Sequence, residues 1–183
     1  MERLIKTENL YEGKILTLQR QTVALADDTS ALREVVHTSG SSGVLAIDGA
    51  KALFVRQWRT PLGQETLEVP AVRIEAQESP LMCAKRELNE EAGLSAANWH
   101  EAADFYQAAG FSDARCHLFM ATDLTTLTHK RPQDVGEFVR AQWLTLEEAQ
   151  AQVDKRLIVD AKSQLAVVLW ANAQLKGQQN ARH

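Results

Sequence analysis

One helix, with strong signals at both of its ends, constrains this chain more than any other feature. Ser79 is a favoured N-cap residue, Pro80 fits the first helical position, where its missing N–H costs nothing, and Gly93 suits a left-handed C-terminal cap. The apolar residues between these ends recur at helical spacing, and they are Leu81, Ala84, Leu88 and Ala92. The sequence therefore predicts an amphipathic helix over residues 79–93 that packs one face on another layer of the protein.

The same helix carries three carboxylates on one side. Glu87 and Glu91 are one turn apart and offset by about 40°, because each residue advances roughly 100°, and Glu90 lies beside them. Like charges at this spacing repel one another, so the cluster suits either a solvated face or a bound cation. Oxygen-only ligands suit Mg²⁺ or Mn²⁺, and the adjacent Arg86 is placed to orient a carboxylate.

Length and charge exclude several classes of protein. The 183 residues suit one domain with a small extension, and a net charge of −4 provides no large positive field for nucleic acid. The longest apolar stretches fall far short of the ~20 residues that a membrane span needs, and the N-terminus has no signal-peptide pattern. Cys83 and Cys116 lie in no CxxC pattern, which indicates reduced thiols in a cytoplasmic protein.

The remaining segments predict a mixture of strands and helices without regular βαβ alternation, which favours an α+β fold. Strands are expected over residues 15–24, 32–37, 44–47, 52–58, 99–107, 115–121 and 138–144, and Trp58 is expected in the core. Thr145 and Glu148 form a capping-box pattern, and Asp160 is placed to cap a last helix to about Leu175. We therefore expect an N-terminal β-hairpin extension over residues 1–40, a main domain over residues 41–176 and a frayed tail over residues 177–183.

The segment from Val72 to Leu94 resembles the Nudix box. That pattern is a glycine, five residues, a glutamate and seven residues, then Arg-Glu-aliphatic-x-Glu-Glu-x-Gly-aliphatic. The matching positions here are Glu78, Arg86, Glu87, Leu88, Glu90, Glu91, Gly93 and Leu94. At ~6% usage per residue type, six fixed matches arise by chance at on the order of 10⁻⁷ per starting position. The resemblance implies a Nudix-type α/β/α sandwich with a mixed sheet.

Other segments narrow the resemblance to the ADP-ribose pyrophosphatase branch of the Nudix hydrolases. They cover residues 55–59, 65–71, 110–113, 117–119 and 136–139. This resemblance implies Mg²⁺-dependent cleavage of the diphosphate of ADP-ribose, or of a related nucleoside-diphosphate sugar, to a nucleoside monophosphate and a sugar phosphate. Hydrolases of GDP-mannose share these segments, so another nucleoside-diphosphate sugar remains an alternative.

Two positions depart from the family pattern and leave a second alternative open. Val72 stands where the box has glycine, and a β-branched residue would be strained if the backbone there needed a positive φ. Ala114 stands where relatives commonly carry glutamate. These departures suit a Nudix-fold nucleotide-binding or regulatory protein with weakened catalysis.

The resemblance also implies roles for individual residues. Its metal ligands are Glu78, Glu87, Glu90, Glu91 and the carbonyl of Ala71, and its substrate-binding residues are Arg56, Arg59, Glu68 and Ser112. Glu137 is the implied general base, with Asp134 in reserve, while Glu87 and Glu91 carry the metal-dependent chemistry. Relatives form homodimers through the N-terminal extension, so a homodimer is expected.

Overall fold

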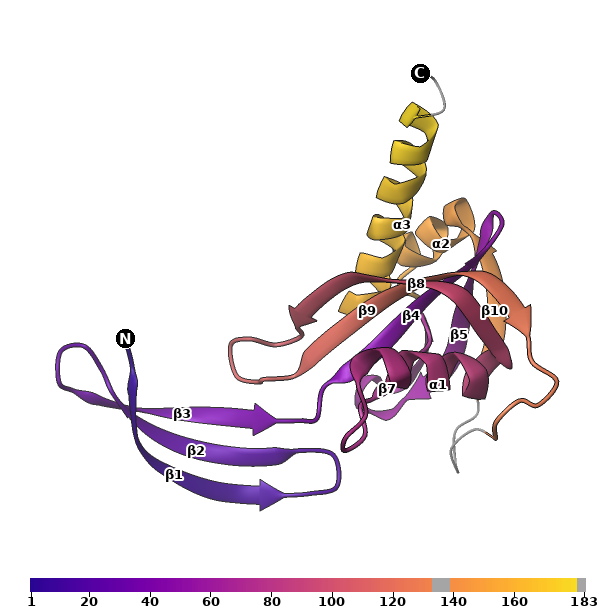
Figure 1. Ribbon diagram of the computed structural model, residues 1–183. Coiled ribbons are helices and arrows are strands. Elements are labelled where there is room, and N and C mark those ends of the chain that lie inside the picture. The colour runs from indigo at the N-terminus through magenta and orange to yellow at the C-terminus, as the bar shows by residue number, and fades with distance from the viewer. Residues whose placement is uncertain (133–138, 181–183) are drawn as a thin grey trace.

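The structure, a computed structural model, describes residues 1–132 and 139–180, which form two sheets and three α-helices (Figure 1). The first sheet is antiparallel and contains β1 (Arg3–Glu12), β2 (Thr17–Ala24) and β3 (Ser30–His37) in that order. The expected hairpin corresponds to β2 and β3, whereas β1 was missed. Every residue of β1 is exposed, so its sequence lacks the alternation that marks a half-buried strand.

The second sheet is mixed and forms the centre of the main domain. Its principal strands are β4 (Ser41–Asp48), β5 (Lys51–Arg59), β8 (Leu94–Tyr106), β9 (Arg115–Thr126) and β10 (Arg140–Thr145). They lie in the order β10-β5-β4-β9-β8, and β4 and β9 are parallel while the other neighbours are antiparallel. The α+β class expected from the sequence is confirmed.

Strands β4 and β5 diverge within this sheet. They pair only next to their connecting turn, where Ile47 faces Ala52 and Asp48 faces Lys51. Beyond that point β5 pairs with β6 (Gln64–Glu68), and β4 pairs with β7 (Ala71–Arg73). The divergence places the start of β4 and the end of β5 on opposite sides of an opening in the sheet.

Helices cover both faces of the mixed sheet, which confirms the α/β/α sandwich (Figure 1). Helix α1 (Pro80–Ala92) packs on one face, where Ala84 and Leu88 contact Val44 and Leu53. Helices α2 (Leu146–Asp154) and α3 (Ala161–Asn180) cover the other face. The core on that side includes Leu45, Phe54, Leu67, Ala149, Ala166 and Trp170. Successive residues of β4 thus supply opposite faces, as strand geometry requires.

The helix ends are set by the local signals in the sequence. Ser79 accepts a hydrogen bond from the N–H of Met82, and Gly93 adopts the left-handed conformation with φ of 67°. Thr145 and Glu148 form the expected capping box of α2, and Asp160 accepts a hydrogen bond from the N–H of Ser163 at the start of α3.

Helix α3 has 20 residues and ends at Asn180, later than the end expected near Leu175. In Figure 1 its C-terminal part rises away from the sheet. Across the described ranges, no helix is long and apolar enough to cross a membrane.

Candidate active site

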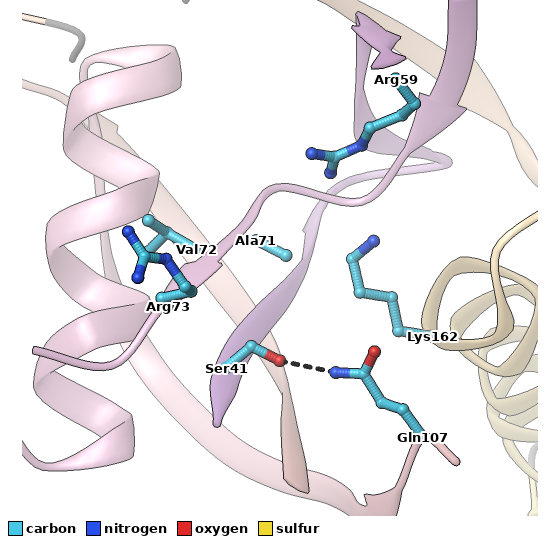
Figure 2. A pocket seen from close by; sticks show the side chains of 7 residues that line it. All are labelled: Ser41, Arg59, Ala71, Val72, Arg73, Gln107 and Lys162. Atoms are coloured by element: carbon cyan, nitrogen blue, oxygen red, sulfur yellow. Dashed lines mark hydrogen bonds between the residues drawn. The ribbon is translucent and has the colours of Figure 1, made fainter. Parts of the chain in front are cut away.

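A cavity of about 290 Å³ occupies the opening between β4 and β5 (Figure 2). Its lining residues come from β4, β5, β7, the chain after β8 and the start of α3, and they are Ser41, Arg59, Ala71, Val72, Arg73, Gln107 and Lys162. Three of these side chains are cations and none is a carboxylate. The cavity therefore favours an anionic ligand.

Helix α1, which carries the predicted carboxylates, packs against β7, and β7 forms one wall of this cavity. Cys83 donates through its Sγ to the carbonyl oxygen of Arg73 at 3.5 Å, so this side of α1 faces β7. Glu87 and Glu91 follow Cys83 at successive four-residue steps and therefore share its side of the helix. Both glutamates are buried, with 5% and 6% of their surface exposed. Helix α1 therefore carries these two predicted ligands on the side from which Cys83 contacts β7, the strand that contains Ala71.

Arg86 holds the two other predicted metal ligands. Its Nε and Nη2 donate to the two carboxylate oxygens of Glu78 at 2.9 and 3.0 Å, and its Nη1 donates to Oε2 of Glu90 at 2.9 Å. Arg86 lowers the pKa of Glu78 through these hydrogen bonds, and Glu78 in turn raises the pKa of Arg86. In this arrangement Glu78 and Glu90 are oriented by Arg86, as expected for Arg86 from its position beside the acidic cluster.

The chemistry of the donors fits a hard divalent cation. Glu87, Glu90 and Glu91 offer only carboxylate oxygens, and the backbone of Ala71 can add a carbonyl oxygen. Cys83 is an unsuitable ligand because burial, followed by the charge of Glu78, raises the pKa of its thiol to about 12. The set of donors therefore suits a hard divalent cation better than zinc.

Glu68 lies behind the cavity rather than on its surface. Its carboxylate is 2% exposed and accepts two hydrogen bonds from Arg59, both at 2.6 Å. Thr66 donates to it at 2.6 Å and Lys162 at 2.5 Å. Burial raises the pKa of Glu68, but Arg59, Lys162 and Thr66 together bring it down to about 2. The group is a carboxylate at any pH near neutrality.

Lys162 is a functional candidate that the sequence did not reveal. It lies 94 residues from Glu68 in the chain, and it donates also to Asp160 at 2.8 Å. Burial lowers its pKa, but Asp160 and Glu68 raise it above the ordinary value, so the amine stays charged. Near Lys162 the sequence pattern indicated only a helix cap at Asp160. A helix cap gives no information about contacts with a distant strand such as β6.

Ser112 connects the loop after β8 to the N-terminal sheet. Its hydroxyl donates to the carbonyl oxygen of Val36 in β3 at 2.9 Å and accepts from the N–H of Ala114 at 3.1 Å. Asp113 strengthens the same junction, because its carboxylate bonds His37 at 2.7 Å and the N–H of Thr38 at 3.1 Å. The structure therefore shows Ser112 bonded within the protein, and Ser112 is not among the residues that line the cavity.

The structure also places three strand residues that the sequence singled out, namely Val72, Trp58 and Arg56. Val72 lies in β7 opposite Ser42, and the positive φ of the loop before α1 falls at Gln77, with φ of 67°, so valine causes no strain. Trp58 was expected in the core, but this is wrong, since 60% of its surface is exposed near the end of β5. Arg56 lies in β5 opposite Leu67 and is not among the residues that line the cavity.

The implied general base, Glu137, and its reserve, Asp134, lie outside the described residues. The chain that precedes them contacts the C-terminal half of α1. Lys130 donates to the carbonyl oxygen of Glu91 at 2.8 Å, and the N–H of Arg131 donates to the side chain of Asn89 at 3.0 Å.

Comparison with known proteins agrees with this geometry. The NUDIX domain model matches residues 38–163. The chain is 37% identical to the ADP-ribose pyrophosphatase of Bacillus subtilis (strain 168) over 91% of this chain and 90% of the relative. It is 35% identical to the methanol dehydrogenase activator of Bacillus methanolicus, again over 91% and 90% of the two chains. The crystal structure of an ADP compounds hydrolase shares the fold, with a TM-score of 0.86, 18% identity and coverage of 97% and 95%. The chain belongs to the Nudix hydrolase family.

Proposed function

We propose that this chain is an Mg²⁺-dependent pyrophosphohydrolase that cleaves ADP-ribose to AMP and ribose 5-phosphate. The observation that carries the proposal is the packing of α1, which holds a buried carboxylate pair, against β7, which lines a cationic cavity. The printed name of the Bacillus subtilis relative supports the choice of substrate. A relative in Mycobacterium tuberculosis with 31% identity over 94% of this chain has the same name.

Glu87, Glu91 and the carbonyl of Ala71 are the residues that we propose to hold the metal. Glu90 and Glu78 complete the ligand set, and Arg86 orients their carboxylates. When bound, Mg²⁺ neutralises phosphate charge and acidifies a coordinated water. Mn²⁺ suits the same oxygen ligands.

Cationic side chains would bind the diphosphate in the cavity. Arg59 and Arg73 line it from β5 and β7, and a guanidinium group pairs well with phosphate oxygens. Arg56, which the family resemblance implies as a substrate-binding residue, is a further substrate contact in this proposal. Ser112 would support the site through the loop that it bonds to β3.

The reaction needs a water that is aligned and deprotonated. The water oxygen forms a bond to one phosphorus, the bridging P–O bond breaks, and the proton passes to a base. Glu137 is the base that we propose, and Asp134 is the reserve. The contacts of Lys130 and Arg131 with α1 support this choice, because these two residues precede Glu137 by only a few positions in the chain.

We also propose a homodimer that acts in the cytoplasm. The N-terminal sheet supports the dimer, because it exposes apolar side chains such as Leu4, Ile5 and Leu32 at 54%, 54% and 62%. Cys83 and Cys116 are buried free thiols, which suits a reducing compartment. Sedimentation of the full chain tests the dimer, and a purely monomeric protein at micromolar concentration would contradict it.

The decisive experiment is a substrate panel with and without Mg²⁺. The full chain is incubated with ADP-ribose, GDP-mannose and ADP-glucose, and the nucleoside monophosphates are separated and quantified. We expect AMP from ADP-ribose at the highest kcat/KM, and only with a divalent metal. Binding of ADP-ribose without turnover would favour the regulatory alternative, and a preference for GDP-mannose would identify another nucleoside-diphosphate sugar as the substrate.

A further inference from the structure

Two cations share one buried carboxylate at the edge of the cavity. Arg59 on β5 and Lys162 on α3 both donate to Glu68, which is 2% exposed. Arg59 alone already satisfies this carboxylate in the two-pronged geometry that a guanidinium group provides. Lys162 also pairs with Asp160, so it bridges two carboxylates, of which Glu68 already has Arg59 as a partner.

The donor count of Lys162 leaves one N–H for a ligand. An ammonium group has three donors and no acceptor. Among the described residues, its hydrogen bonds go to Glu68 at 2.5 Å and to Asp160 at 2.8 Å. The side chain is 12% exposed, and that exposed part borders the cavity. Figure 2 shows its amine and the guanidinium group of Arg59 directed toward the same part of that cavity.

The backbone next to Lys162 is fixed to the strand that contains Glu68. Ser163 is fully buried, and its hydroxyl accepts a hydrogen bond from the N–H of Val69 at 2.9 Å. The N–H of Leu67 donates to the carbonyl oxygen of Leu157 at 2.9 Å. These contacts hold the start of α3 against the end of β6, so the amine has a defined position at the cavity wall.

We propose that Lys162 is a further substrate-binding cation, beside Arg59 and Arg73, that donates to a phosphate oxygen of the nucleoside-diphosphate sugar. In this proposal Glu68 is a positioning residue that fixes Lys162 and Arg59 at the cavity wall. This inference rests on the proposed function for the identity of the ligand. The chemistry it requires is that of a diphosphate, whose oxygens accept from both cations at once. Glu68, buried behind the cations, acts on the substrate only through them.

The test compares equilibrium binding in four variants of the full chain. They are Lys162→Met, Lys162→Arg, Glu68→Gln and the double variant Lys162→Met with Glu68→Gln. Lys155→Met, at an exposed residue directly after α2, is the control. Calorimetry in EDTA measures the Kd for ADP-ribose and for inorganic pyrophosphate without turnover. Circular dichroism melting checks the fold of each protein. The double variant removes both charges of the pair, so it keeps the test valid if Lys162→Met alone does not fold.

We expect Lys162→Met to raise both Kd values by about 10- to 100-fold, the effect of one lost charged hydrogen bond. Lys162→Arg should recover part of that loss, and Lys155→Met should bind like the wild type. The double variant should bind no better than Lys162→Met. If it binds like the wild type, Lys162 serves only as a counterion for Glu68 and the inference is overturned.

Two further outcomes separate this inference from the proposed function. Wild-type hydrolysis of ADP-ribose with unchanged Kd values in Lys162→Met would overturn the inference and leave the function standing. Absence of hydrolysis by the wild type, together with tight metal-free binding that depends on Lys162, would overturn the function and support the cationic site. No binding by the wild type at millimolar pyrophosphate would also overturn the inference, because three cations at one cavity must retain affinity for a diphosphate.

Discussion

Arg86 and Glu78 are joined by two parallel hydrogen bonds of 2.9 and 3.0 Å, from one side of α1 to the loop that precedes it. The remaining nitrogen of Arg86 donates to Glu90, one turn further along the helix. One guanidinium group therefore fixes the loop after β7 to the acidic helix and neutralises two carboxylates that would otherwise repel Glu87 and Glu91.

Replacing both buried carboxylates should abolish metal-dependent turnover. Glu87→Gln with Glu91→Gln preserves the shapes of both side chains but removes the charges that we propose to hold Mg²⁺. We expect kcat/KM for ADP-ribose to fall by about 100-fold or more, because metal catalysis contributes several kcal/mol. Calorimetric titration with Mg²⁺ should show the matching loss of metal binding. Glu147→Gln, an exposed carboxylate of α2, is the control, and full activity in the double variant would refute the mechanism.

Arg86→Met should destabilise the protein. Arg86 is 14% exposed and its partners Glu78 and Glu90 are 15% and 17% exposed, so the variant leaves two partly buried carboxylates without their shared cation. Breaking a fully buried pair costs about 3–5 kcal/mol, so for this partly buried group we expect a loss of about 1–3 kcal/mol in the free energy of unfolding. Arg86→Lys should cost less but still be destabilising, since an ammonium group cannot donate in parallel to both oxygens. Urea denaturation measures the free energy of unfolding of both variants. A wild-type midpoint for Arg86→Met would show that these ion pairs do not contribute to stability.

Acid should remove the stabilisation provided by Glu68. Its pKa is lowered in the folded chain from the ordinary value of 4.5 to about 2. A group with a depressed pKa contributes stability that is complete above its unfolded pKa and is lost as the pH falls toward the folded value. Unfolding free energies measured between pH 5 and pH 2, a window set by these values, should therefore fall less steeply for Glu68→Gln than for the wild type. Identical slopes would mean that Glu68 keeps its ordinary pKa.

Two glycine substitutions should have opposite effects on stability. Gly93→Ala places a Cβ on a left-handed residue with φ of 67°, and that atom would lie 3.3 Å from the Cβ of Lys130. We expect a loss of about 1–2 kcal/mol. Gly177→Ala is the matched control in α3, where a Cβ meets no atom within 4 Å and alanine is the better helix former. Thermal melting should shift down for the first variant and stay level or rise for the second.

Much of this site could be predicted because its signals are local. Ser79 and Gly93 determine where α1 begins and ends within one turn of chain, and helical spacing alone puts Glu87 and Glu91 on one side. The mixed α+β class and the α2 capping box followed from patterns of the same range. The prediction for Trp58 was wrong because the residues around an aromatic side chain near a strand end do not indicate whether another part of the chain covers it.

What the sequence determined by itself is therefore the acidic helix, its limits and the spacing of the carboxylates on which the proposed metal site rests. The tertiary structure alone decided that β4 and β5 diverge, that Val72 is a paired strand residue, and that Lys162 meets Glu68 across 94 residues. The physical reason is the range of the interactions. A helix cap and a carboxylate stripe are satisfied within a few residues, whereas a cavity between diverging strands exists only once sheet pairing and the packing of α3 bring distant segments together.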